Sequence, residues 1–139
     1  DGGGPDTSKC LRAQARWRDY QRFSVFVDSM MVELEGIYGD LGLSHDDKVS
    51  RREVIFTQAL TRFDNEIAPT FESVTFRGFR ETSLNNATLL SRIRYYHRLP
   101  DFARMLEERG GDLAGLLAEL RTTKDTVSDP FDLLPEGTP

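Results

Sequence analysis

The sequence predicts an all-α protein, a helical bundle of about four main helices led by a long antiparallel helical hairpin. Three observations support this prediction. Apolar residues recur at steps of three and four over most of the chain, capping residues precede periodic segments, and the single strand-like stretch has nothing to pair with. With 139 residues, the chain is long enough for one domain with its own core.

The clearest periodic signal predicts a long first helix over residues 8–38. Phe26 and Met31 widen its apolar face beyond a two-helix seam, which favours a bundle over an isolated coiled coil. The apolar stripe consists of Tyr20, Phe23, Val27, Met30, Leu34, Ile37 and Leu41.

A second helix is predicted directly after a short connection. Ser44 and Asp47 have the spacing of a capping box, in which a hydroxyl and a carboxylate satisfy the first backbone N–H groups. Helical spacing then continues through Phe56, Leu60 and Phe63. Because the connection is short, we expect the first two helices to pack antiparallel.

The remaining elements are less regular. We expect a short helix or an ordered loop over residues 69–82, where a strand is the weaker alternative. A helix should run from Leu84 to Pro100, because proline ends or kinks helices. The register of leucines then continues past Gly110 and Gly111, where we favour a break with Asp112 capping the last helix.

These elements suggest three parts: a flexible segment over residues 1–7, a bundle over residues 8–121, and an extended tail over residues 122–139 that is flexible unless it docks.

Composition excludes several classes of function. A net charge of -5 argues against a dedicated nucleic-acid binder. A lone cysteine, Cys10, excludes a disulfide-stapled scaffold, and no run is apolar enough to span a bilayer. The sequence holds no catalytic motif, so we expect no cofactor and no metal. His45 and His97, the two histidines, are interpreted as a solvated first-turn residue and a helix-end residue.

The start of the first helix is the leading candidate for a binding site. Its five cations, Lys9, Arg12, Arg16, Arg18 and Arg22, are accompanied by a single acid, Asp19. The apolar stripe fades towards this end, so we expect the helix to protrude, with Trp17 on it. Such a helix suits a protein partner or a membrane surface, and the alternative is a solvated overhang.

The second half of the first helix has the opposite charge. Residues 28–47 contain six carboxylates and no basic residue. The molecule is therefore polarised along its first helix, which bears on association. The wide apolar face could also be buried in a homodimer.

Glu53 carries a second hypothesis. It falls where the stripe of the second helix calls for an apolar residue, and a buried carboxylate needs a partner. A ligand-binding or catalytic bundle could use Glu53 with Tyr20, Tyr96 or His97. The alternative is that the seam opens near the loop and Glu53 reaches water.

A second basic run gives a remote hypothesis of nucleic-acid binding. Arg92, Arg94, Arg98 and Arg104 surround two tyrosines, and arginine with tyrosine can bind phosphates or stack on bases. The same pattern fits an amphipathic helix with its arginines outward, and no nucleic-acid partner is expected.

Two passages resemble a family of small bacterial membrane-anchored proteins of uncharacterised function. Residues 79–96 show a short helix, a turn and a helix ending in paired tyrosines, and Arg16-Trp17-Arg18-Asp19-Tyr20 is similar to that family's basic, Trp-containing helix start. The chain has Thr82-Ser83-Leu84 where the family has a serine-glycine turn. The resemblance covers residues 16–99 and implies topology, with a transmembrane helix upstream, but no activity.

The sequence therefore predicts a non-enzymatic helical interaction or sensory module. It would be the helical domain of a membrane-anchored or complex-bound protein. The expected binding residues are Arg12, Arg16, Trp17, Glu53, Tyr96 and His97.

Overall fold

The computed structural model describes residues 7–135, and over that range it contains helices, helical turns and loops but no strand. This confirms the predicted all-α class. The chain divides into two compact units, residues 1–97 and residues 98–139, where the sequence predicts one bundle through residue 121. The segment expected to be flexible lies, except for Thr7, outside the described residues.

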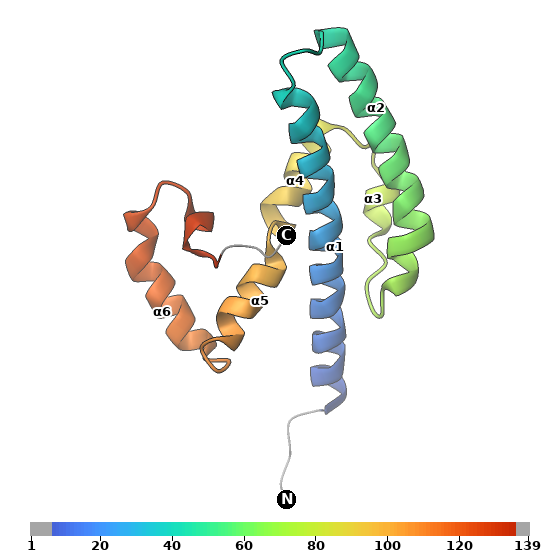
Figure 1. The fold of residues 1–139 in the computed structure, drawn as a ribbon. Coiled ribbons are helices and arrows are strands. Elements are labelled where there is room, and N and C mark those ends of the chain that lie inside the picture. The colour runs from blue at the N-terminus through green and yellow to red at the C-terminus, as the bar shows by residue number, and fades with distance from the viewer. Residues whose placement is uncertain (1–6, 136–139) are drawn as a thin grey trace, which may run out of the picture. The chain divides into compact units, whose positions relative to one another are not determined.

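The first unit is led by the predicted hairpin. Helix α1 (Thr7–Gly39) and helix α2 (His45–Arg62) run antiparallel and side by side, joined by a short loop (Figure 1). The predicted capping box is confirmed, since the Asp47 backbone N–H donates to Ser44 Oγ at 3.1 Å and the Ser44 backbone N–H donates to Asp47 at 3.2 Å. These bonds satisfy N–H groups that the helix itself leaves unpaired.

The core of the first unit lies along the predicted stripe of α1. One member of the stripe is wrong: Leu41 is 97% exposed, because α1 ends at Gly39 and Leu41 lies in the loop. Helix α2 contributes Ile55, Phe56 and Ala59 from its inner face. The fully or nearly fully buried apolar residues of α1 are Phe23, Phe26, Val27, Met30 and Leu34.

The segment after α2 forms helical turns followed by an ordered loop. A π-helical turn, η1 (Phe63–Ile67), leads into a 3-10 turn, η2 (Ala68–Thr70), whose first turn holds Pro69. Proline suits this position because its missing N–H would be unpaired there anyway. The loop then reaches Phe76, a residue with φ of 46°, before helix α3 (Arg77–Glu81). The strand alternative is therefore wrong.

Helix α4 (Asn86–Tyr96) closes the first unit. It begins at an Asn85 capping box and ends four residues before the expected stop, because His97 is extended and Arg98 is left-handed with φ of 54°. Pro100 lies in the first turn of the next helix instead of ending this one. Leu89 is buried against the core, whereas Leu90 is 64% exposed.

The second unit is a smaller helical pair. Helix α5 (Leu99–Glu107) and helix α6 (Leu113–Thr123) are separated by Gly110 and Gly111, which have φ of 64° and 81°. The predicted break is confirmed, and Asp112 caps α6 by accepting from the Gly115 backbone N–H. The leucine register fails at the break, and Leu113 is 55% exposed.

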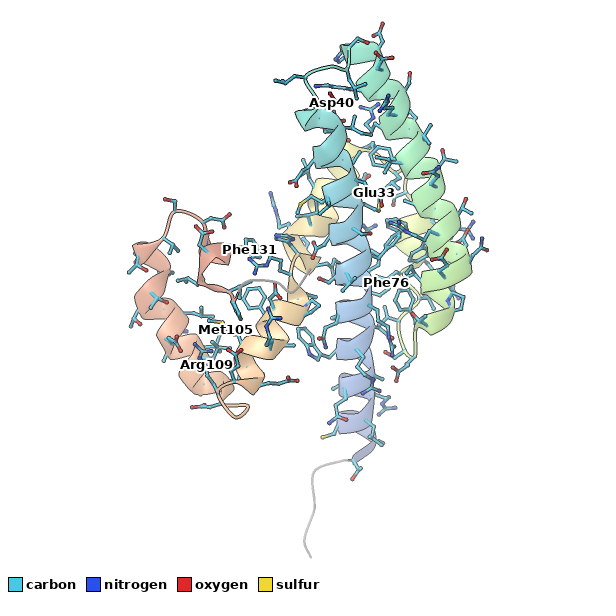
Figure 2. All side chains as sticks on the ribbon, in the orientation of Figure 1. Glu33, Asp40, Phe76, Met105, Arg109 and Phe131 are labelled. Atoms are coloured by element: carbon cyan, nitrogen blue, oxygen red, sulfur yellow. The ribbon has the colours of Figure 1, made fainter. Side chains whose placement is uncertain are left out.

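The tail continues the helical pair instead of extending away from it. After α6 come two 3-10 turns, η3 (Lys124–Thr126) and η4 (Pro130–Leu133). Leu134 is buried in the cluster of the second unit that Met105 and Phe131 also join, both labelled in Figure 2. The Arg98 guanidinium donates to the backbone carbonyls of Phe131 and Pro135 at 3.0 and 2.8 Å. Residues 124–135 therefore pack on the helical pair within the second unit.

We predict that two glycine-to-alanine substitutions change stability in opposite directions. A Cβ at Gly36 or Gly111 meets no atom within 4 Å, so backbone conformation decides both outcomes. Gly36→Ala, inside α1, should stabilise by about 1 kcal/mol. Gly111→Ala should destabilise by about 1–2 kcal/mol because its φ is positive. Urea unfolding followed by circular dichroism measures both, and a neutral Gly111→Ala would contradict the left-handed turn.

Candidate functional site

The basic start of α1 has no buried residue before Asp19. Its side chains border a groove with a volume of about 350 Å³. Trp17 is 39% exposed there, and Arg12 and Arg16 are both exposed. The structure therefore brings together the three residues predicted at this end of the helix. The groove is lined by Lys9, Arg12, Ala13, Arg16, Trp17 and Tyr20.

Two of the predicted basic residues, Arg18 and Arg22, bond other parts of the protein instead of facing a partner. Arg18 Nε donates to Glu72 at 3.0 Å, and Arg22 donates to Glu72, to Asp19 and to the Thr70 carbonyl at 2.7, 3.1 and 2.9 Å. Arg18 and Arg22 thus hold the loop after η2. Within residues 7–135, Arg12 and Arg16 form no ion pair.

Asp19, which comes directly before the groove residue Tyr20 in the sequence, is fully buried. Three consecutive backbone N–H groups, those of Glu72, Ser73 and Val74, donate to its carboxylate at 2.9, 2.7 and 3.0 Å. The Ser73 hydroxyl adds a fourth bond at 3.1 Å, and Arg22 a fifth. We call this arrangement the Asp19 clamp. It compensates the buried charge and fastens the loop to α1.

Hydrogen bonds around the clamp lower the pKa values of two carboxylates, Asp19 and its neighbour Glu72. Burial raises the pKa of Asp19, but the backbone and hydroxyl bonds outweigh burial and leave that pKa below its ordinary value. Hydrogen bonds from Arg18 and Arg22 lower the pKa of Glu72 to about 2. Both carboxylates are therefore ionised at neutral pH.

The clamped loop places aromatic rings against the end of the groove. Phe76 stacks on Phe23 with ring centroids 4.1 Å apart, and Figure 2 labels Phe76. Tyr20 packs edge-on against Phe76 and Tyr96 at 5.9 and 5.7 Å. Burial raises the pKa of Tyr96, and Tyr20 adds to this effect. Tyr96 is thus part of an aromatic cluster that supports the groove.

Among the described residues Glu53 reaches water, which is the outcome that the open-seam alternative predicts. The Glu53 side chain is 60% exposed, and its carboxylate bonds only Arg52, its neighbour in sequence. The inner face of α2 passes through Ile55 and Ala59 instead, which turns Glu53 towards solvent. Glu53 is not joined to the cluster of Tyr20 and Tyr96.

The two histidines lie where the sequence predicts them, His45 in the first turn of a helix and His97 at a helix end. His45 is the exposed first residue of α2. His97 lies just beyond α4, with its Nδ1 2.6 Å from the Asp28 carboxylate. Within residues 7–135, no group of three or more His, Cys, Asp or Glu side chains could hold a metal ion.

The second basic run is divided between the two units. Arg92, on α4, donates to the Gly78 carbonyl at 2.9 Å. Arg98 and Arg104 both bind Asp101 in α5, which is nearly buried. Arg94 is exposed. Asp101 therefore offsets two of the four cations on which the nucleic-acid hypothesis depends.

The sequence analysis missed Asp19 as a structural centre, although a signal for it exists. Asp19 precedes Phe23 by four residues, Phe26 by seven and Met30 by eleven, so it lies on the buried face of α1. An acid on that face requires donors. The three N–H groups that supply them come from a loop without a recognisable motif.

The fold and the site define a small all-helical protein with a basic, partly aromatic groove on its longest helix. The chain belongs to the family described as "Putative aminopeptidase", whose sequence model matches residues 4–129. No curated protein and no solved structure matches the chain. None of the described helices combines the length and the hydropathy needed to cross a bilayer. The resemblance to membrane-anchored proteins stays a prediction.

We predict that Asp19→Ala destabilises the protein by about 3 kcal/mol, because it leaves three part-buried backbone N–H groups without their acceptor. Because the folded-state pKa is lowered, this stabilisation is present above the ordinary value of 3.8 and is lost as pH falls through the folded pKa. The difference from wild type should therefore shrink in acid.

Urea unfolding at pH 7 and at acid pH measures this difference. Asp125→Ala is the matched control, since the Asp125 side chain is 81% exposed and, among the described residues, pairs only with Lys124. That variant should lie within about 0.5 kcal/mol of wild type. An Asp19→Ala variant as stable as the control would show that the clamp does not hold the fold.

Proposed function

We propose that this chain is a non-enzymatic interaction module, and that it docks an acidic helical or extended segment of a protein partner in the groove at the start of α1. The observation that carries the proposal is the stretch of α1 before Asp19, where no residue is buried, Trp17 is partly exposed, and Arg12 and Arg16 form no ion pair with any residue in the described range 7–135. Exposed arginine beside an aromatic ring is the composition typical of binding surfaces.

The arrangement of apolar side chains favours a protein partner over a membrane. A helix lying in a bilayer surface needs one continuous apolar face. Leu11 and Trp17 are the large apolar residues exposed before Asp19, and their six-residue separation places them about 120° apart around the helix. A groove lined by two aromatic side chains, Trp17 and Tyr20, and by cations fits a segment that carries both carboxylates and apolar side chains.

The two kinds of contact contribute differently. Exposed ion pairs are worth about 0–1 kcal/mol each and weaken with salt. Most of the affinity should therefore come from burial of Trp17, while Arg12 and Arg16 select an acidic partner and speed its approach. Binding should weaken as salt rises, but it should not vanish.

Membership of the "Putative aminopeptidase" family raises peptide hydrolysis as an activity of the family. For this chain, the non-enzymatic role is better supported by its side chains. The candidate carboxylate Glu53 is exposed and paired with Arg52, and His97 faces Asp28. The Glu53-based catalytic bundle is the alternative, and it would require these groups to rearrange.

Trp17 provides a direct test, because it is the only tryptophan in the chain. We predict that its emission shifts to the blue when a synthetic amphipathic peptide of glutamate and leucine is titrated in. Arg12→Glu/Arg16→Glu should weaken binding at least tenfold. Arg94→Glu/Arg121→Glu, which makes the same change in net charge at exposed positions, is the control and should bind as wild type does.

Parallel titrations with vesicles of anionic and of neutral lipid distinguish a protein partner from a membrane surface. A shift with anionic vesicles but not with the peptide would replace the protein partner by a membrane. No shift with either, or equal binding by both double variants, would overturn the proposal.

We also predict no hydrolysis of aminoacyl p-nitroanilides by this chain, with or without added Zn²⁺, because the proposed role needs no catalytic group. The assay measures nitroaniline release against protein concentration. Release that scales with protein and disappears in Glu53→Gln would favour the catalytic alternative.

A further inference from the structure

We infer that the acidic partner is a second copy of this chain, and that Trp17 of one copy enters a groove between α1 and α4 of the other. This inference rests on the proposed function, since it names the segment that the basic start of α1 binds. The receiving groove has a volume of about 280 Å³ and an almost wholly apolar lining. It is bordered by Met31, Leu34, Glu35, Tyr38, Asn86, Leu89, Leu90 and Ile93.

The rim of this groove is an exposed apolar surface. Leu90 is 64% exposed and Tyr38 is 41% exposed, whereas Leu34 and Leu89 form a buried floor. Exposed apolar side chains around a concavity are typical of a binding surface. An indole ring would cover Leu90 and Tyr38 and would be removed from water itself.

The groove also contains an acceptor without a donor. Asn86 Nδ2 donates to the Tyr38 hydroxyl at 2.8 Å, but Asn86 Oδ1 is buried and accepts no hydrogen bond from the part of the chain that the structure describes. Tryptophan Nε1 is a donor with no acceptor capacity, so it matches this oxygen.

The charges of the two surfaces are complementary. Residues 7–18 carry four cations and no acid, and Arg12 and Arg16 face solvent among them. Residues 28–47 carry six carboxylates and no cation, and Glu35 is exposed at the groove itself. Each copy therefore offers one basic segment with an aromatic side chain and one apolar groove that has Glu35 at its edge and lies on an acidic stretch of the chain.

Two copies can satisfy both surfaces at once. If each copy inserts its helix start into the other, every contact occurs twice, as in a two-fold symmetric dimer. Contact in one direction only would instead leave one groove and one helix start free and would permit longer chains of molecules. The geometry favours the closed arrangement because both surfaces lie on α1 of the same unit.

Sedimentation equilibrium over a range of concentrations tests the inference. We expect wild type to dimerise, with the Trp17 emission shifting to the blue as the dimer forms. Trp17→Ala should weaken dimerisation at least tenfold. Trp17→Phe, which keeps the ring but loses the N–H donor, should weaken it by less. Val32→Ala, at a position 64% exposed and outside both grooves, should match wild type.

Charge reversal adds a test that loss of folding cannot imitate. Glu35→Lys and Arg12→Glu/Arg16→Glu should each weaken dimerisation several-fold, and the variant combining all three changes should recover it. Glu107→Lys, an exposed position on α5, is the control and should have no effect. Circular dichroism confirms that each variant is folded.

The outcomes separate this inference from the proposed function. A chain that stays monomeric at millimolar concentration, or dimers that Trp17→Ala does not weaken, would overturn the second copy as partner. If the glutamate-leucine peptide still binds at Trp17 in that case, the proposed docking role stands. If the chain neither dimerises through Trp17 nor binds the peptide, both the dimer and the proposed docking function are overturned.

Discussion

The structure of the first unit depends on one buried carboxylate. Asp19 is a charged group removed from water, and it is tolerated because three consecutive N–H groups of the loop at residues 72–74 converge on it. The loop has no secondary structure of its own to hold it. Through this contact it acquires a fixed position, which brings Phe76 onto Phe23 and Glu72 between Arg18 and Arg22.

The Asp19 clamp also separates the two roles of α1. Beyond Asp19 the helix is covered by α2 and α4 and supplies the core. Before Asp19 it carries Arg12, Arg16 and Trp17 with no buried side chain. Because Arg18 and Arg22 are occupied by Glu72, the cations that remain for a partner lie nearest the start of the helix. A single long helix is thus both a core element and, in our proposal, a docking surface.

The fold could be predicted further than the site. The stripe of α1, the Ser44 capping box and the break at Gly110 and Gly111 are local signals, and the structure confirms them. Leu41 failed because periodicity does not show where a helix ends. Asp19 was missed because its donors lie more than fifty residues away in a loop without a pattern.

Amide hydrogen exchange at residues 72–74 tests this account most directly. These N–H groups belong to a loop, yet they donate to a buried carboxylate. We predict exchange as slow as that of the amides of α1 around Phe23, since both require the same opening. Exchange at the rate of a solvent-exposed loop would contradict the claim that Asp19 holds the loop and sets the border of the docking surface.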